Sequence, residues 1–377
     1  MRLYEPSEHS TVPWPKNEDG QYAKSYLEPL MKHGSSLFIA NVNAQTYALQ
    51  WEDKVLPITT ADPFAGNCYV CSPYEHYTTY ALAELDNIQN RVERASLYLF
   101  LKVLALILKF CDIDRVVYIN NWYLSTNLYP AINREELAAI LDLVKKRFPN
   151  RVIMMRSLNP YTNQSLINDA LELGFELIPA RQIFVTDSHK PTYKKKRDFK
   201  SDARLLAKTE YEVLEHNEIH TKHLPRILEL YNLLYLDKYT ELNPQFTIKL
   251  LEQAISNKVL NLRALVKDGT IDAVLGYFKR DGVMTTPLFG YDTKKPPKTG
   301  LYRMISNLLV NASEQEEAVL NQSSGAGKFK KTRGCDKYIE YSLCYTSHAG
   351  LRARSGWKLL KLIGSKLLEP KLLNNDF

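Results

Sequence analysis

The sequence predicts a mixed α/β fold arranged as two domains. Short runs rich in Val, Ile, Tyr and Phe alternate with longer segments of helical period, which is typical of layered α/β structures. The chain has 377 residues, 45% of them hydrophobic, so two cores of ordinary size can be filled. Residues 187–204 are polar and basic, contain Pro191 and lack an apolar period, which predicts an exposed connection. We therefore expect one domain over residues 1–190 and a second over residues 191–377.

The first half is expected to begin with four strands and a long helical region. Turn residues separate four short runs of β-forming residues. A helix is expected over Thr78–Phe110, because Leu82, Leu85 and Ile88 recur at spacings of three. Val92 continues the same face four residues later, so this face should pack on the sheet. The expected strands are Ser36–Ala40, Thr46–Trp51, Lys54–Thr59 and Asn67–Ser72.

The most apolar stretch, Ala95–Phe110, is predicted to be a buried helix and not a membrane span. It is short for a bilayer core, and Lys102 and Lys109 interrupt it. Strands and helices then alternate to the end of the first half. The remaining elements expected there are strands at Arg115–Ile119, Val152–Arg156 and Phe175–Val185, and helices at Arg134–Arg147 and Gln164–Leu173.

The second half is expected to repeat this plan. Asp268–Gly269 and Asp281–Gly282 each separate two β-forming runs, and such dipeptides are strong hairpin signals. They predict three consecutive antiparallel strands, and the shared plan of the halves predicts two similar domains in tandem. The expected elements are strands at Tyr211–Glu215, Leu262–Lys267, Ile271–Arg280, Val283–Tyr291 and Ala318–Asn321, and helices at Leu224–Tyr239, Phe246–Ser256 and Leu301–Ser313.

Charge and terminal sequences leave the partner open. The net charge of +7 would attract phosphates, a nucleotide-bearing cofactor or RNA without requiring any of them. Neither end carries a recognisable targeting or lipidation signal, so we expect a cytoplasmic protein. The basic run Lys194–Arg197 is interpreted as a solvated surface, with RNA contact as the alternative.

Motifs of several other enzyme classes do not fit. The five cysteines lack the spacings of a disulfide framework. Cys68 and Cys71 would point to opposite faces of a strand, which does not suit a zinc site or a redox dithiol. The histidines in HNEIHTKH lack the spacing of zinc-protease motifs, so we expect no metal. In NQSSGAGKFKKTRG, Phe329 stands where a nucleotide-binding P-loop has Ser or Thr. The Gly-x-Ser-x-Gly elbow of serine hydrolases does not occur in the sequence.

The segment GYDTKKPPKTGLYR, residues 290–303, predicts an anion site. It ends a strand at Tyr291 and places Gly300 directly before an amphipathic helix. The free N–H groups of a first helical turn, the helix dipole and the close approach that glycine allows all suit a phosphate. The alternative is an ordinary capped helix with solvated lysines. Positive charge around the turn comes from Lys294, Lys295, Lys298 and Arg303.

Three motifs together resemble the C-terminal half of Fem-like and related GNAT-fold acyltransferases. They are GYDTKKPPKTGLYR, LNQSSGAGKFKKTRG and IEYSLCY, and LYNLLYLDKYTELNPQF resembles the helix and loop that cover the acceptor side in such proteins. The resemblance covers residues 200–370, and the first half matches by general plan. It implies two tandem GNAT-like domains, each a mixed, mainly antiparallel sheet flanked by helices. The second would carry acyltransferase activity, and the first would serve the acceptor side or act as a scaffold.

The resemblance implies direct transfer of an acyl group to an amine, in a small molecule or a peptide, within a ternary complex and without a metal. The donor it implies is a thioester or a charged tRNA, and we place an acyl-CoA-type thioester first. In GNAT enzymes a backbone N–H of the strand before the phosphate loop polarises the donor carbonyl, which maps here to Leu288, Phe289 and Gly290. The donor phosphates map to the turn and the first helical residues, Lys298, Thr299, Gly300, Leu301, Tyr302 and Arg303.

Two other functions stay open. The GNAT phosphate loop usually has the pattern Gln/Arg-x-x-Gly-x-Gly/Ala, whereas Gly300 stands alone among prolines and lysines. An aminoacyl-tRNA-dependent, peptide-bond-forming transferase of the Fem-like kind, with tRNA as partner, is therefore the first alternative. A non-catalytic binding protein that retains the fold is the second.

Proton transfer requires a titratable group in the cleft. Structural hydrogen bonding is the alternative role for each candidate, and Asn243, which precedes a proline, is interpreted first as a turn residue. Lys330 and Arg333 follow a Gly/Ser-rich bend and suit an anionic substrate. The candidate catalytic residues are Asp292, Tyr302, Glu340 and Tyr341. The candidate substrate-binding residues are Tyr239, Asn243, Asn321, Ser324, Lys330 and Arg333.

Overall fold

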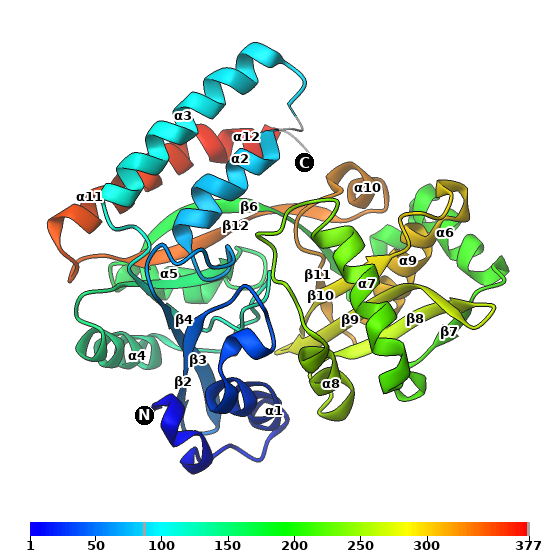
Figure 1. Ribbon diagram of the computed structural model, residues 1–377, viewed down its shortest axis with the longest axis horizontal. Coiled ribbons are helices and arrows are strands. Elements are labelled where there is room, and N and C mark those ends of the chain that lie inside the picture. The colour runs from blue at the N-terminus through cyan, green and yellow to red at the C-terminus, as the bar shows by residue number, and fades with distance from the viewer. Residues whose placement is uncertain (86–87, 375–377) are drawn as a thin grey trace.

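All strands of the computed structural model, which describes residues 1–85 and 88–374, join in one 12-stranded sheet (Figure 1). Their order across the sheet is β1-β2-β3-β4-β5-β12-β6-β11-β10-β9-β8-β7. The strands are β1 (Arg2–Tyr4), β2 (Ala44–Trp51), β3 (Lys54–Ala61), β4 (Val116–Ile119), β5 (Val152–Leu158), β6 (Glu176–Asp187), β7 (Glu212–Leu214), β8 (Asn261–Lys267), β9 (Thr270–Arg280), β10 (Val283–Tyr291), β11 (Val319–Asn321) and β12 (Asp336–Tyr345).

Helices cover both faces of this sheet and bury its apolar side chains in four clusters. None of the helices within residues 1–85 and 88–374 has the length and apolarity needed to cross a bilayer. The helices are α1 (Glu18–His33), α2 (Tyr80–Glu84), α3 (Arg91–Phe110), α4 (Arg134–Arg147), α5 (Gln164–Glu172), α6 (Arg197–Lys208), α7 (Leu224–Tyr235), α8 (Ile248–Ser256), α9 (Leu301–Gln315), α10 (Gly327–Thr332), α11 (Leu351–Ile363) and α12 (Glu369–Asn374).

The two halves repeat one order of elements. The first half ends with β4-α4-β5-α5-β6, and the second ends with β10-α9-β11-α10-β12. In each half the first two of these strands are parallel, and the other pairings are antiparallel. The prediction of mixed, mainly antiparallel sheets flanked by helices is therefore confirmed.

The two halves exchange their last strands at the centre of the sheet. Strand β12 of the second half lies between β5 and β6 of the first half, and β6 in turn pairs with β11. The pairing of β12 with β6 runs from Asp336 opposite Val185 to Cys344 opposite Glu176. Side chains of both halves therefore meet above these central strands, on one continuous sheet.

Two expected strands in the first half are wrong. Ser36–Ala40 and Asn67–Ser72 are turns, apart from a single bridge between Ile39 and Phe246. Their backbone groups bond to distant loops, because the Tyr69 N–H donates to the Leu242 carbonyl and the Cys68 N–H to that of Asn41. Phe38, Ile39 and the whole of Asn67–Ser72 are buried, but apart from the Ile39 bridge these runs pair with no described strand, so their β-forming composition does not lead to strands.

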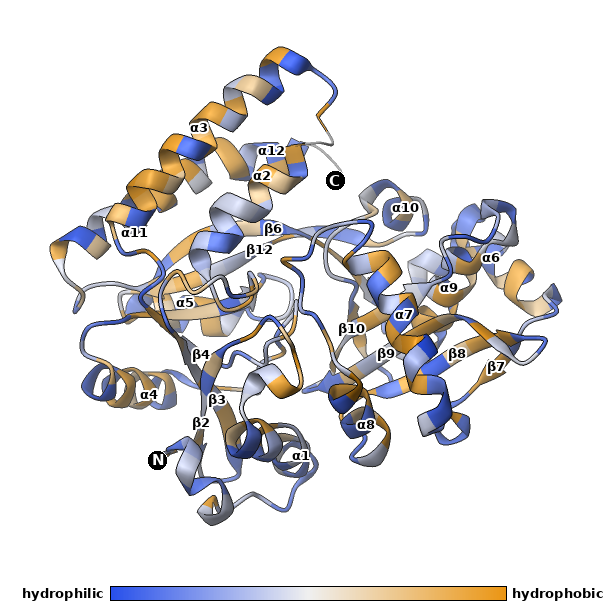
Figure 2. Cartoon of the chain, viewed as in Figure 1, coloured by the Kyte–Doolittle hydropathy of each residue, from blue (hydrophilic) through white to orange (hydrophobic). Residues whose placement is uncertain are grey.

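The expected helical region over Thr78–Phe110 is largely helical in its described residues, 78–85 and 88–110, but it is not one helix. It is divided into a π-helical turn, α2 and α3, and the Asn90 side chain caps the start of α3 by accepting from the N–H groups of Val92 and Glu93. Ala95–Phe110 is not a buried helix, because α3 buries only one face and its outer face carries exposed apolar side chains. In Figure 2 much of α3, at the edge of the molecule, has the colour of hydrophobic residues.

The segment 187–204 is not simply an exposed connection. It contains a 3₁₀ turn, Pro191–Lys195, and most of α6, and it buries Tyr193 and Asp202. Helix α6 packs on α9 with Phe199 against the core. The buried face of α6 includes a charged residue, Asp202, so the sequence does not show the regular spacing of apolar residues that predicts a helix.

Candidate functional site

Strands β10 and β11 separate after a short parallel pairing. Val283–Thr285 lies opposite Val319–Asn321, and the register of β10 then shifts between Thr285 and Leu288 at Pro287, which has no N–H to donate. Leu288–Tyr291 pairs with β9 alone among the described strands. The opposite edge of Leu288–Tyr291, where the resemblance places the oxyanion-stabilising amide, is left open by the bulge.

Gly290 lets α7 approach this strand closely. A Cβ atom at this position would lie 2.5 Å from the Leu230 carbonyl oxygen and 2.7 Å from the Tyr231 nitrogen. Both are backbone atoms of a helix and cannot move aside without displacing it. Gly290 therefore has a packing role beside its predicted donor-binding role.

We predict that Gly290→Ala lowers the free energy of unfolding by about 2 kcal/mol, in the range of overpacked cores. The measurement is equilibrium unfolding in urea. Gly350→Ala is the matched control, because an added Cβ there would meet no atom within 4 Å. Equal losses for the two variants would contradict the close approach of α7.

The turn before α9 bonds most of its N–H groups internally. The N–H groups of Asp292, Lys295, Thr299 and Gly300 donate to backbone carbonyls, and that of Lys294 donates to the Asp292 carboxylate. The turn also contains two prolines, which have no N–H. Gly300 adopts φ +74°, and a Cβ there would lie 2.6 Å from Leu205 of α6. Glycine is therefore required by the backbone and by α6, and Leu301, Tyr302 and Arg303 supply the first N–H groups of α9.

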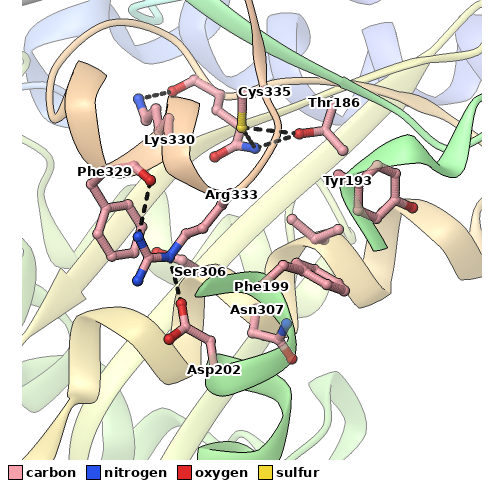
Figure 3. Close-up of a pocket in the computed structure, with 12 residues that line it drawn as sticks. Thr186, Tyr193, Phe199, Asp202, Ser306, Asn307, Phe329, Lys330, Arg333 and Cys335 are labelled. Carbon is pink, nitrogen blue, oxygen red and sulfur yellow. Dashed lines mark hydrogen bonds and ion pairs between the residues drawn. The ribbon is translucent and has the colours of Figure 1, made fainter. Parts of the chain in front are cut away.

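Arg303 and Arg333 share one buried carboxylate. Arg303 Nε lies 2.6 Å from Asp202 Oδ1 and Arg333 Nε lies 2.5 Å from Asp202 Oδ2. The Arg333 guanidinium also stacks on Phe329, 3.4 Å from the ring centroid. Figure 3 shows Asp202 directed at Arg333 along one side of a small pocket. The structure thus brings together two predicted anion-binding residues, and both are already ion-paired.

Lys330 holds the loop that follows β11. Its Nζ donates to the carbonyls of Gln322 and Ser324 at 2.8 and 2.9 Å and contacts that of Ser323 at 3.4 Å. Asn321 stabilises the same loop by accepting from the Ser323 N–H. Lys330, Asn321 and the Ser324 backbone therefore fix the loop beside the separated strands, and burial lowers the pKa of Lys330 to about 7.

This buried lysine predicts a pH dependence of stability. Unfolding returns the pKa of Lys330 from about 7 to 10.5, so between these values the unfolded state binds more protons and stability rises with pH. The contribution is at most about 1.4 kcal/mol per pH unit, and it is flat below pH 7. Lys330→Met should remove this slope in denaturant unfolding from pH 7 to 9, whereas the exposed Lys328→Met should keep it. Parallel curves for wild type and Lys330→Met would contradict the assignment.

Tyr302 lies in an aromatic cluster beside the open edge of β10. Its ring centroid is 5.7 Å from those of Phe289 and Tyr291 and 4.7 Å from that of Phe329. Burial raises the pKa of Tyr302, so its hydroxyl stays protonated at neutral pH. The exposed Tyr239 follows α7 toward the same region. This cluster, Phe289, Tyr291, Tyr302 and Phe329, gives the site an apolar lining.

The other catalytic candidates are engaged in separate contacts. Burial raises the pKa of Asp292, but the Arg226 side chain, at 2.7 Å, and the Lys294 N–H outweigh it and leave the pKa below its usual value. Tyr341 donates to Glu369 of α12 at 2.5 Å. Asn243 Nδ2 donates to two carbonyls of its own turn, at Tyr235 and Thr240. The structure does not bring Asp292, Tyr341 and Asn243 to one point.

Glu340 forms the centre of a different group, on the exchanged strands. It accepts both Nε and Nη2 of Arg181 on β6, at 2.8 and 3.2 Å, and Arg181 also donates to the Ser125 carbonyl. Burial lowers the pKa of Arg181, but the Glu340 carboxylate outweighs it and raises the pKa. This two-point ion pair fixes a guanidinium above the middle of the sheet.

Sequence analysis misses the residues of the first half that face Arg181. Burial raises the pKa of Tyr69, Tyr80 and Glu84, and the positive charge of Arg181 opposes the rise at all three. Glu84 is exposed to solvent, yet surrounding atoms partly desolvate its carboxylate. It is the last residue of α2, and the charge of Arg181 on β6 acts on it. A solvent-accessible carboxylate with a raised pKa is suited to accept a proton from an amine.

The corresponding strand separation in the first half is filled by the chain itself. Residues 120–129 follow β4 and are almost entirely buried, with Trp122 and Tyr123 in the core. The buried Arg156 of β5 lies 3.3 Å from the Asn121 side-chain oxygen and 3.3 Å from the Val70 carbonyl. The open edge of β10 in the second half is therefore the better place for a donor.

With this geometry established, comparisons with known proteins identify the fold. No protein-family model and no curated protein sequence matches the chain. The chain is similar in structure to FemX, with a TM-score of 0.53 and 12% sequence identity over 96% of this chain and 100% of FemX. It also matches L-PGS from Bacillus licheniformis, with a TM-score of 0.45 and 13% identity over 61% of this chain and 78% of that one. The chain has the FemX fold, and the predicted resemblance to Fem-like, GNAT-fold proteins is confirmed as a likeness of fold.

Proposed function

We propose that this protein transfers an acyl or aminoacyl group to an amine, with the donor bound in the second half. The observation that carries the proposal is the open edge of β10 at Leu288–Gly290, in a chain that has the FemX fold over nearly its whole length. An N–H on this edge would stabilise the oxyanion that forms when the amine attacks the donor carbonyl. The carbon–nitrogen bond forms in this attack, and the amine loses a proton to a base. Collapse of the tetrahedral intermediate then breaks the carbon–sulfur or carbon–oxygen bond, and the thiol or hydroxyl leaving group takes up a proton.

The structure of the turn favours aminoacyl-tRNA over acyl-CoA as donor. A coenzyme pyrophosphate needs several free N–H groups in the turn before α9. Here four N–H groups of residues 292–300 bond within the turn, that of Asp292 donates to Asp272 of β9, and two residues are prolines. The first turn of α9, Leu301–Arg303, would offer its N–H groups to a single phosphate of a nucleotide chain. The predicted phosphate contacts at Gly300–Arg303 and the acyl-CoA donor remain part of the proposal as the second choice.

For the proton, we propose Glu84 as the general base, in place of the four residues predicted from sequence. The acceptor amine would enter above β6 and β12, between Glu84 of the first half and the aromatic cluster of the second. Arg181, fixed by Glu340, would hold Glu84 and an anionic group of the acceptor in place. In this arrangement the first half supplies the base and the second half binds the donor, which would explain why the two halves share one sheet.

A transfer assay tests the proposed function. The protein is incubated with an amine panel and either a mixture of radiolabelled aminoacyl-tRNAs or labelled acyl-CoAs, and label is followed into the amine. Transfer from tRNA, with binding that weakens steeply as salt increases, supports the preferred donor. Transfer from acyl-CoA alone would identify acyl-CoA, and not aminoacyl-tRNA, as the donor. Binding of either donor without transfer would show a non-catalytic binding protein and refute the proposed activity.

A further inference from the structure

Helix α3 carries two opposite apolar faces, and only one of them packs on the protein. The inner face buries Leu101, Leu104 and Leu108 against α11 and the sheet. On the outer face, Leu99 is 65% exposed and Leu106 is 72% exposed. The exposed apolar residues at spacings of seven, four, three and four form one stripe along the helix. We call it the outer stripe, and its residues are Val92, Leu99, Val103, Leu106 and Phe110.

Positive charge is concentrated on the same part of the molecule. Helix α3 and residues 351–374, which form α11, α12 and the turn between them, contain ten lysines and arginines and two glutamates. The rest of the chain has 39 basic and 40 acidic side chains, so it is close to neutral. The net charge of +7 thus comes from these helices, although Arg352 and Lys361 pair with acidic residues of the body.

Three of the four cations of α3 border the outer stripe. At about 100° per residue, Arg91, Lys102 and Lys109 lie on one side of it, roughly a quarter-turn from its centre. Lys102 lies against Tyr98, with its Nζ 5.4 Å from the ring centroid. Figure 1 shows α3 projecting from the sheet with α11 behind it, and in Figure 2 much of α3 has the colour of hydrophobic residues. An apolar stripe with a basic border is typical of helices that lie in a membrane interface.

We infer that the outer stripe docks this protein on the surface of a membrane that contains anionic phospholipids. The apolar side chains enter the boundary between headgroups and acyl chains, and the lysines and arginines contact lipid phosphates. A second copy of the chain is a poorer occupant, because it would bring an equally basic surface against this one. The helix lies on the bilayer and does not span it, since its inner face stays packed on the protein.

Vesicle sedimentation of the full chain tests this inference without any donor or acceptor, so it is independent of the proposed reaction. Wild type should sediment with vesicles of phosphatidylcholine and phosphatidylglycerol, and far less with phosphatidylcholine alone. The double variant Leu99→Glu, Leu106→Glu should reduce the bound fraction by roughly tenfold or more. Leu171→Glu, an exposed leucine on α5, should leave it unchanged.

The same variants distinguish a membrane from a second copy of the chain as the partner of the outer stripe. Because both leucines are exposed, the double variant should keep the thermal melting temperature of wild type, which shows that it folds. Wild type that does not bind anionic vesicles, or a double variant that binds them equally, overturns the inference. Ultracentrifugation in which wild type is a dimer and the double variant a monomer, without vesicle binding, overturns it in favour of an interface between copies.

Discussion

Replacing Asp202 with alanine should lower the free energy of unfolding by about 3 kcal/mol. The Asp202 side chain is buried and binds Arg303 and Arg333 at once. Removing one partner of a buried ion pair leaves uncompensated charge and typically costs about 3–5 kcal/mol. The lower end applies because Arg303 is partly exposed, so water can replace its lost partner. Urea unfolding, monitored by circular dichroism, measures the difference.

Asp198 provides the control on the same helix. Its carboxylate lies 3.7 Å from Arg333, but it is well exposed, so Asp198→Ala should change stability by less than about 1 kcal/mol. The comparison of the two variants also tests the surroundings of the donor site. Asp202 holds α6 against α9 and α10, and these two helices carry Tyr302 and Phe329 of the aromatic cluster. Losses of similar size for the two variants would show that Asp202 does not organise this region.

The parts of the fold that sequence predicts well are those fixed by local chemistry. The three strands β8, β9 and β10 lie within one residue of their expected ends. Asp268–Gly269 and Asp281–Gly282 all adopt positive φ, the conformation that two-residue hairpins require and that Asp and Gly tolerate. Each hairpin is specified by its own turn, so no distant contact is needed to predict it.

The parts that sequence analysis misses depend on distant partners. Helix α11 is not predicted, although its Trp357 is fully buried against residues from α3 and the central strands. The pairing of β12 between β5 and β6 joins segments far apart in the chain. A local pattern of hydrophobic residues does not specify which strand of the other half a strand will meet.

The candidate site divides in the same way. The strand, turn and helix around Gly300 are contiguous, so their arrangement follows from the sequence, and Tyr302 does lie beside the open edge of β10. The partners of Arg303 and Glu340 come from 101 and 159 residues away, Asp202 and Arg181. These predicted charged residues are therefore ion-paired with residues that the sequence analysis did not select, because the partners lie far away in the chain.

The loss of the Glu84 carboxylate should have the largest effect on activity. Glu84→Gln keeps the size and hydrogen-bonding capacity of the side chain but does not accept a proton from an attacking amine. We expect kcat to fall by roughly 10²- to 10⁴-fold, with little change in KM for the donor. Steady-state kinetics with the donor identified in the transfer assay measure both constants.

The pH profile separates a general base from a merely structural carboxylate. Burial raises the pKa of Glu84 above 4.5, against the opposing charge of Arg181, and only the ionised form accepts a proton. The wild-type rate should therefore rise with pH until this raised pKa is passed, and the rise should disappear in Glu84→Gln. Glu135→Gln, an exposed glutamate on α4, should keep both the rate and the profile. A Glu84→Gln variant with a lower rate but an unchanged profile would assign Glu84 to positioning, and the proton would then pass to another group near Arg181.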